Sequence, residues 1–371
     1  MMAKALSSLL NPFGSGIIAQ SMFDSPPKGI NALAAMVAAN TPVREPGFGA
    51  LGALRAPVPQ FDFGALAGFK AVDIQPPWIA VRERFRQFHG NLALTTLQQT
   101  DGHTKRFNVV SCLNRAYYGR SSDTDNSFFV GSWGKGTAIR PPRDVDIYFL
   151  LDVPVYNRFQ GHIWNRQSAL LQEVKDVLTE TFPNTDMRGD GQVVMVNFGS
   201  YNVEVIPAFQ LTTQGRYWIC DTNDGGSYKE TSPWDEVDHL EKVDSANARN
   251  LRPLIRMLKA WQAWCSVPIK SFQLELLAAE FIAESPWRLY DWFFFDWIMR
   301  DFFAYLYGRA NGTVYVPGTL EPIALGYDWQ SRALSAYQRA LKACDFEQHN
   351  RVAEAGDEWQ KIFGLDVPRM A

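Results

Sequence analysis

Two spacings of apolar residues alternate along this chain after about residue 77. From Trp78 to Leu94, from Thr104 to Tyr118 and from Ser168 to Phe182, apolar side chains recur at helical spacing. Short apolar runs between and after these stretches predict strands at 128–130, 147–151, 193–198 and 203–207. Helices interspersed with strands in this way predict an α+β core, in which a mixed sheet carries helices.

The pattern becomes helical after about residue 245. Leu251 to Cys265 places apolar residues on one stripe, and further helices are expected at 272–284, 287–307, 329–344 and 347–362. Residues 1–76 differ from both parts, because they are rich in Ala, Gly and Pro and poor in charge. The chain is therefore divided into an N-terminal extension at 1–76, a sheet-containing core at 77–245 and a helical second lobe at 246–371.

Composition narrows the class of protein. The net charge of -3 argues against a surface that coats nucleic acid, so nucleic-acid binding is not expected. The four cysteines are scattered without a Cys-x-x-Cys pair, which argues against a structural zinc site and favours a reducing compartment. No run of eighteen apolar residues is present, so no membrane span is expected. These features predict a cytoplasmic protein.

Two aspartates open the expected strand at 147–151. Asp144 and Asp146 are two residues apart, so a strand points both side chains to the same face. Two carboxylates this close repel each other unless a cation lies between them, and Mg²⁺ prefers such oxygen ligands. Upstream, Gly131 and Ser132 offer backbone N–H groups and a small hydroxyl to a triphosphate. The pattern predicts metal-dependent nucleotidyl transfer.

A third carboxylate strengthens this interpretation. Glu204 stands between Val203 and Val205 in an expected strand, so its side chain lies on the opposite face from theirs. If this strand pairs beside the one that carries Asp146, Glu204 joins the aspartates around two metal ions. Each feature alone has an ordinary explanation, as a turn, a solvated side chain or a plain loop. Their occurrence together and in order favours the metal site.

The helical half adds cationic and aromatic candidates. Arg252, Arg256 and Lys259 are spaced by four and three residues, within reach of a common anion, although such a row is often a solvated helix face. We favour Lys259 as the residue that holds the outer phosphates of a triphosphate. Ser271 is either a helix cap or a phosphate contact, and Phe272 is either a core residue or a ring that stacks on a nucleobase.

Five segments in order resemble one enzyme family. They read GSWGKGTAIRPPRDVDIYFLL, NVEVIPAF, RPLIRMLKAWQAW, KSFQLELLAAEFI and EWQKIFG, and together they span roughly residues 80–364. They resemble the CD-NTases, bacterial relatives of animal cyclic GMP-AMP synthase and of the oligoadenylate synthetases. The resemblance implies a polymerase-β-like nucleotidyltransferase core with a helical second lobe. It also implies synthesis of cyclic or short linear oligonucleotides as second messengers, many of which activate an effector in anti-phage (CBASS) systems.

The resemblance also implies individual roles. Gly131 and Ser132 would hold the donor triphosphate, Lys259 and Ser271 would contact phosphates, and Phe272 would stack on a base. The metal ligands would be Asp144, Asp146 and Glu204, binding two Mg²⁺ ions with Mn²⁺ as a substitute. Glu204 would also help to deprotonate the attacking ribose hydroxyl, and it replaces the Asp more common in the bacterial enzymes. Residues 1–76 have no counterpart that we recognise.

The expected function is therefore Mg²⁺-dependent condensation of nucleoside triphosphates into a cyclic di- or trinucleotide, with release of pyrophosphate. ATP, GTP or both would be substrates, a pyrimidine nucleotide stays open, and a downstream effector would receive the product. Three alternatives stay open. The protein could transfer nucleotides to RNA or protein, it could be a non-catalytic nucleotide-binding module, or a partner machine could conjugate its terminal Ala371 to other proteins.

Overall fold

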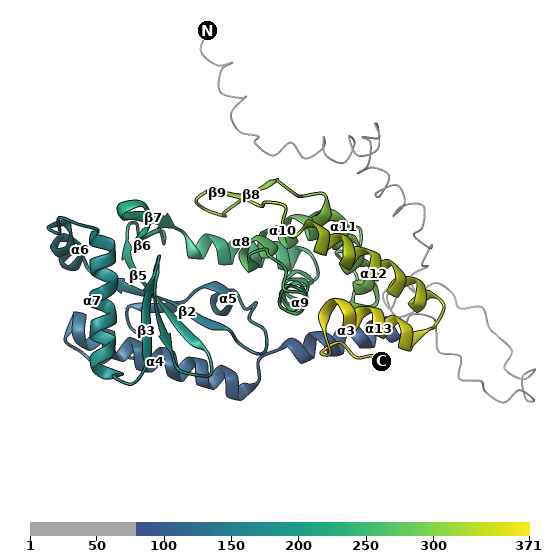
Figure 1. The fold of residues 1–371 in the computed structure, drawn as a ribbon, viewed down its shortest axis with the longest axis horizontal. Coiled ribbons are helices and arrows are strands. Elements are labelled where there is room, and N and C mark those ends of the chain that lie inside the picture. Colours follow the sequence, from purple (N-terminus) through teal and green to yellow (C-terminus); the bar gives the residue numbers. More distant parts are fainter. Residues whose placement is uncertain (1–78) are drawn as a thin grey trace, which may run out of the picture. The chain divides into compact units, whose positions relative to one another are not determined.

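The computed structural model describes residues 79–371, all of which belong to one compact unit (Figure 1). The extension expected at 1–76 lies outside the described residues. The core elements are α4 (Thr96–Tyr118), β1 (Ser127–Phe129), α5 (Gly131–Gly134), β2 (Asp144–Leu151), α6 (Val153–Gln160), α7 (Arg166–Thr181), β3 (Asp186–Asp190), β4 (Val193–Asn197), β5 (Asn202–Gln210), β6 (Tyr217–Asp221) and β7 (Ser227–Thr231). The helical elements are α3 (Ile79–Leu92), α8 (Pro233–Ala246), α9 (Leu251–Trp264), α10 (Ser271–Glu284), α11 (Phe295–Tyr307), α12 (Gln330–Gln348) and α13 (Val352–Phe363), with a hairpin of β8 (Thr313–Tyr315) and β9 (Pro322–Ala324).

Within the described residues, seven strands form one mixed sheet. The order β1-β2-β5-β4-β3 makes β2 and β5 central neighbours, and this pair is parallel while the other pairs are antiparallel. β5 is long enough to pair twice along one edge, first with β4 at Val205 and then with β6 at Ala208. β7 extends the sheet beyond β6. The expected α+β core with a mixed sheet is confirmed.

The alternating sequence of β2 separates two faces of the sheet. Val145, Ile147 and Phe149 are buried and pack with apolar residues of α4 and α7, which cover that face. Asp144 and Asp146 point to the opposite face because neighbouring strand residues alternate. One face of the strand therefore holds the core while the other presents the aspartates.

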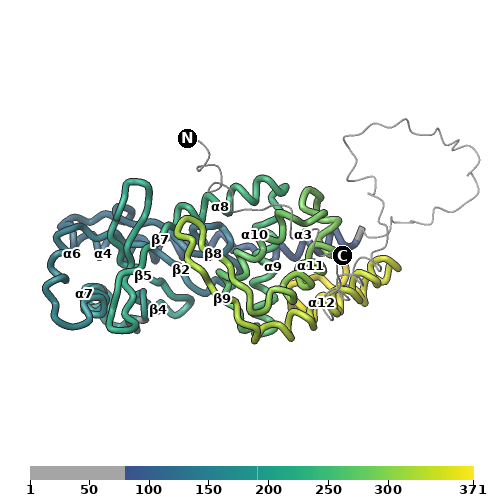
Figure 2. The backbone as a smooth tube through the Cα atoms, turned by 90° about the horizontal axis from the view of Figure 1, so that it is seen from above, coloured from purple at the N-terminus to yellow at the C-terminus, as the bar shows by residue number. Residues whose placement is uncertain are grey.

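The helical lobe includes a helix that precedes the core in sequence. α3 packs against α9 and α11, among which it lies in Figure 2. Phe85 stacks edge-on against Trp359, with ring centroids 5.1 Å apart, and Arg84 Nε lies 3.1 Å from Glu347 Oε1. The division expected from the sequence assigned α3 to the core at 77–245, whereas α3 packs with the helices of the second lobe at 246–371. Helical periodicity shows that α3 has an apolar face, but it does not show which part of the chain covers that face.

The other differences are local. The helix expected at 287–307 begins at Phe295, because Asp291 accepts a hydrogen bond from Phe293 N and starts a separate 3-10 turn at Trp292–Phe294. The sequence interpretation also omitted α6, α8, β3, β6, β7 and the β8–β9 hairpin. The four cysteines are all free thiols. Among residues 79–371, no helix combines the length and the apolar character that a membrane crossing requires.

Candidate active site

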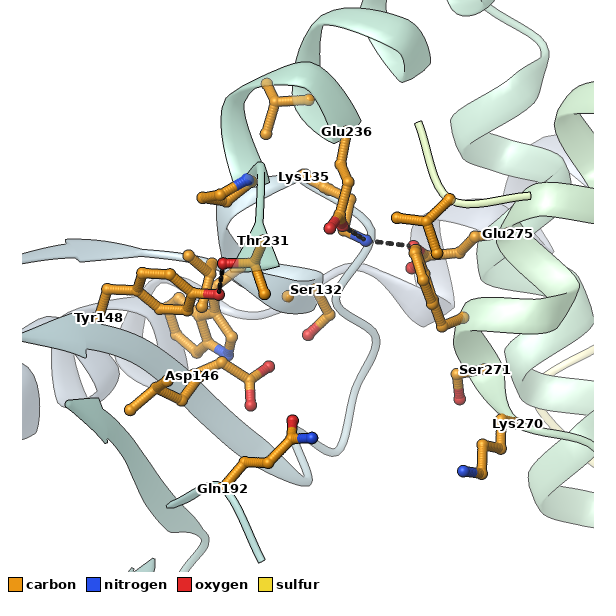
Figure 3. Close-up of a pocket in the computed structure, with 18 of the residues that line it drawn as sticks. Ser132, Lys135, Asp146, Tyr148, Gln192, Thr231, Glu236, Lys270, Ser271 and Glu275 are labelled. Atoms are coloured by element: carbon orange, nitrogen blue, oxygen red, sulfur yellow. Dashed lines mark hydrogen bonds and ion pairs between the residues drawn. The ribbon is translucent and has the colours of Figure 1, made fainter. Parts of the chain in front are cut away.

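A pocket of about 790 Å³ lies between the open face of the sheet and the helical lobe (Figure 3). Its floor includes Asp144 and Asp146 of β2 and the turn that begins at Gly131. Its opposite wall is formed by Lys259 of α9 and by the start of α10. The β8–β9 hairpin contributes the edge from Pro322 to Ala324. The pocket therefore gathers residues from both lobes.

Three carboxylates meet on the sheet beside this pocket, and two of them, Asp144 and Asp146, line it. Asp146 is paired directly with Glu204 in the parallel register of β2 and β5, and Asp144 is two residues earlier on the same face. One oxygen of each side chain lies within 4.8 Å of the others. We call Asp144, Asp146 and Glu204 the carboxylate triad. The sequence analysis made the meeting of the three acids depend on these two strands being neighbours; they are neighbours, and their pairing is parallel.

Electrostatics show that this arrangement is unfavourable without a cation. Burial raises the pKa of Asp146 well above its usual range, and the nearby charges of Asp144 and Glu204 raise that pKa further. Burial also raises the pKa of Asp144, against the lowering effect of Lys259 and Arg143. A bound divalent cation would relieve this repulsion, and an all-carboxylate donor set suits Mg²⁺ or Mn²⁺. The residues present therefore fit a metal site.

Gly131 is pressed against the triad. It has a positive φ of 55°, and a Cβ atom there would lie 1.9 Å from Asp146 Oδ2. Val130 N donates a hydrogen bond to Asp146 O at 3.0 Å, and Trp133 Nε1 donates to Asp144 O at 2.8 Å. These contacts hold the turn beside both aspartates and leave no space for a side chain at 131. Ser132 follows and points into the pocket (Figure 3).

The start of α10 faces the triad from the other lobe. Ser271 is the first residue of α10, and its hydroxyl donates a hydrogen bond to Gln262 Oε1 at 2.9 Å. Phe272 is half-buried, and Lys135 Nζ lies 4.3 Å from the centroid of its ring. Lys270 and Ser271 lie across the pocket from Asp146 (Figure 3). Both candidates from this segment, Ser271 and Phe272, thus line the same pocket as Asp144 and Asp146.

The basic face of α9 is arranged differently from the expectation of a shared anion. Arg252 Nε donates to Lys135 O at 3.1 Å, and Arg256 Nη2 donates to Gly136 O at 2.9 Å. Lys259 lines the pocket, but its Nζ donates to Thr137 and forms an ion pair with Glu275 Oε1 at 2.6 Å. Each of these three cations thus has a protein partner in the structure, and phosphate contact by Lys259 stays a prediction.

Several pocket residues were missed by sequence reasoning. Lys135 and Glu275 stand inside segments that carried the resemblance, but no spacing rule connects them, because they lie on different elements. Tyr148 OH and Thr231 Oγ1 lie 3.0 Å apart on the core side of the pocket. Gln192 reaches the pocket from the turn between β3 and β4 (Figure 3). Finding these residues requires the tertiary contacts.

Sequence comparisons agree with this geometry. The family model of the Second Messenger Oligonucleotide or Dinucleotide Synthetase domain matches residues 79–244. The chain is 22% identical over 302 residues to a probable cyclic nucleotide synthase of Bacillus cereus (strain VD146), which covers 72% of this chain and 88% of that protein. It is 24% identical over 156 residues to the CBASS oligonucleotide cyclase CdnC of Escherichia coli (strain KTE188), covering 40% of this chain and 48% of that protein.

Solved structures show the shared fold. Escherichia coli CdnC with ATP aligns with a TM-score of 0.55 and 20% identity, over 78% of this chain and 99% of that chain. The Vibrio cholerae cyclic AMP-GMP synthase DncV with a linear intermediate aligns with a TM-score of 0.55 and 14% identity, over 78% of this chain and 87% of that chain. The polymerase-β-like core with a helical lobe is thus confirmed. Residues 79–244 therefore form a Second Messenger Oligonucleotide or Dinucleotide Synthetase domain that contains the whole carboxylate triad, and the chain is a nucleotidyltransferase similar to the CD-NTases.

Proposed function

We propose that this nucleotidyltransferase condenses nucleoside triphosphates into a cyclic di- or trinucleotide and releases pyrophosphate. The observation that carries the proposal is the carboxylate triad, of which Asp144 and Asp146 line one pocket together with Ser271 and Phe272. The relatives named as cyclic nucleotide synthase and cyclic AMP-GMP synthase support this class of product. ATP and GTP appear in the names of related structures, which supports purine triphosphates as substrates here.

The triad would hold two Mg²⁺ ions, with Mn²⁺ as a substitute. Metal ions bound there would lower the pKa of the attacking ribose hydroxyl and stabilise charge on the leaving pyrophosphate. Glu204 is paired with Asp146 on the neighbouring strand, so it stands where it can orient that hydroxyl and accept its proton. The clustered carboxylates, whose mutual repulsion is described above, support a site built for cations.

The triphosphate would lie between the two lobes. The turn at Gly131 approaches the triad closely, and the hydroxyls of Ser132 and Ser271 would contact phosphate oxygens from opposite sides. Lys259 adds positive charge at the wall, but direct phosphate contact would require one of its present acceptors to move. Phe272 would stack on a base with the face of its ring that Lys135 does not occupy.

The pocket has the size of a small-molecule site. Small-molecule pockets span about 300–1,000 Å³, and this pocket of about 790 Å³ lies in the upper part of that range. Ring closure requires a donor and an acceptor nucleotide beside the same metal site. We place the reaction in the bacterial cytoplasm, in anti-phage signalling to a nucleotide-activated effector. The CBASS name of the Escherichia coli relatives supports that setting.

The test is direct synthesis. Purified protein is incubated with four labelled ribonucleoside triphosphates and Mg²⁺, treated with phosphatase and analysed by chromatography with mass spectrometry. We expect a phosphatase-resistant product without terminal phosphates, whose mass gives the bases and the ring size. The double variant Asp144→Asn with Asp146→Asn is the control and should form none. Label on RNA or protein, or binding of triphosphate without turnover, would contradict the proposal and favour one of the alternatives.

A further inference from the structure

Four charged side chains meet at one wall of the pocket, of which three are buried and one, Glu236, is partly exposed. This lysine–glutamate cluster consists of Lys135, Glu236, Lys259 and Glu275, and all four line the pocket. Glu275 Oε2 lies 2.9 Å from Lys135 Nζ, and Glu275 Oε1 lies 2.6 Å from Lys259 Nζ. Glu236 Oε2 lies 3.0 Å from Lys135 Nζ (Figure 3). Two positive and two negative side chains are thus paired, which removes most of the penalty for burying each charge.

Glu275 is the centre of this cluster. Its side chain is 6% exposed, and burial alone would raise its pKa, but the attraction and hydrogen bonds of Lys135 and Lys259 lower that pKa to about 2. Thr137 Oγ1 donates a further hydrogen bond to Glu275 Oε1 at 2.8 Å. Both carboxylate oxygens therefore already accept hydrogen bonds, so Glu275 is poorly suited to serve as a metal ligand or a proton acceptor.

The cluster joins two segments that face the substrate from opposite sides. Lys135 and Thr137 belong to residues 131–137, which we call the Gly-Ser loop and which begins against Asp146. Glu275 lies one helical turn after Ser271 on α10, so both residues share a face of that helix. Lys135 Nζ also contacts the Phe272 ring. The cluster therefore fixes the first turn of α10 relative to the Gly-Ser loop.

These contacts fit a structural role for Lys135 and Lys259 better than direct binding of phosphate by either lysine. Lys259 Nζ has three hydrogens and three acceptors, namely Glu275 Oε1 at 2.6 Å, Thr137 Oγ1 at 2.9 Å and Thr137 O at 3.3 Å. Lys135 Nζ is held between two carboxylates, and its side chain is 6% exposed. Either lysine would have to leave a buried carboxylate in order to bind phosphate, and an uncompensated buried charge is strongly unfavourable.

Building on the proposed function, we infer that Glu275 is a positioning residue of the nucleotidyl-transfer site. Through Lys135 and Thr137 it sets the separation between the Gly-Ser loop and the first turn of α10. That separation determines where Ser271 and Phe272 hold a donor nucleotide relative to the carboxylate triad. A displacement of about 1 Å in a reacting group costs up to about 10²-fold in rate. The contacts of Glu275 with Lys135 and Thr137 therefore control turnover more than they control binding.

Glu275→Gln tests the inference because it keeps the shape and removes the charge. Turnover should fall about 10- to 100-fold. Binding of a non-hydrolysable ATP analogue with Mg²⁺, measured by calorimetry, should stay equal or become tighter, since Lys135 and Lys259 lose a counter-charge. Hydrogen exchange at the Thr137 amide, which donates to Ser132 O, should become faster. Thr137→Val, which changes no charge, should show the same pattern with a smaller loss, about 3- to 10-fold.

Glu358→Gln is the matched control. Glu358 is also a buried glutamate of the helical lobe that pairs with two cations, Arg339 and Lys361, but it does not line the pocket. Removal of the Glu358 charge should lower the melting temperature and leave turnover within twofold of wild type. Glu275→Gln turnover within twofold of wild type would overturn the inference, as would a parallel loss of turnover and analogue binding. A wild-type protein without product would refute the proposed function instead, while binding and exchange would still test Glu275.

Discussion

Asp146 and Glu204 are direct partners across the parallel strands β2 and β5, so the fold itself brings two acids together on one face. A parallel pair buried on one side tolerates such a pairing when the acids have a shared function, because carboxylates in contact weaken the folded state. Asp144 adds a third oxygen within 4.8 Å. Repulsion among the three carboxylates lowers the stability of the folded state, so variants of these residues can test the arrangement.

Asp146→Asn should separate activity from stability. Turnover should fall at least about a thousandfold, which corresponds to about 4 kcal/mol in the barrier. In metal-free buffer the melting temperature should equal or exceed that of wild type, because burial and two neighbouring carboxylates disfavour the charged Asp146. Product formation and thermal unfolding in EDTA measure both. Asp357→Asn, at an exposed ion pair with Arg369, is the control and should keep wild-type turnover.

Divalent metal should stabilise the wild-type protein. Binding to the folded state alone adds about 2.7 kcal/mol at a hundredfold excess over Kd, so Mg²⁺ or Mn²⁺ should raise the melting temperature by several degrees. The rise should disappear in Asp144→Asn with Asp146→Asn, because the remaining Glu204 offers a single carboxylate. Differential scanning fluorimetry with and without metal is the measurement. An equal rise in the double variant would place the stabilising metal elsewhere.

Gly131→Ala should damage the site more than the fold. Gly131 and Gly119 both have left-handed backbones, with φ of 55° and 66°, so an alanine at either position costs about 1–2 kcal/mol in stability. At 131 the new Cβ would also collide with Asp146, whereas at 119 nothing lies within 4 Å. Turnover should fall at least about 100-fold for Gly131→Ala and stay within twofold for Gly119→Ala. Equal activity of the two variants would contradict the close approach.

His89 should make stability depend on pH. Burial, assisted by the charge of Arg256, lowers the pKa of His89 from 6.5 to about 4. Between these values the unfolded chain binds a proton that the folded chain does not, so stability is lost as pH falls from 6.5 to about 4. Part of the side chain reaches solvent, which moderates the effect. His89→Gln should lose stability less steeply across this window in urea unfolding; identical slopes would refute the assignment.

Local rules predicted the parts of the site that lie close together in the sequence. Asp144 and Asp146 follow from strand alternation, and the face of Glu204 follows from Val203 and Val205. That β2 and β5 are neighbours was only a condition of the sequence interpretation, suggested by the chemistry that three acids would perform together; the structure shows that they pair and that the pairing is parallel. The roles of the individual site residues stay predictions.

The remaining contacts depend on residues far apart in the chain. Thr137 and Glu275 are separated by 138 positions, and no periodicity relates a loop threonine to a helical glutamate. Arg252 and Arg256 look like a free basic row in sequence, yet they bind carbonyls of the Gly-Ser loop. Charge patterns show which residues need partners, whereas the fold decides whether protein groups or a ligand provide them.

The contact of Arg84 with Glu347 also has a consequence during synthesis. The two residues are separated by 263 positions, and Arg84 further donates to the carbonyls of Val352, Pro368 and Arg369. At 5–20 residues per second, the ribosome needs roughly 13–53 s to reach Glu347 after Arg84 is made. Throughout that interval α13, whose Trp359 and Phe363 cover Phe85 and Phe88 of α3, has not yet been made. Chaperones can bind this face of α3 during translation, and the translation rate sets how long it is exposed.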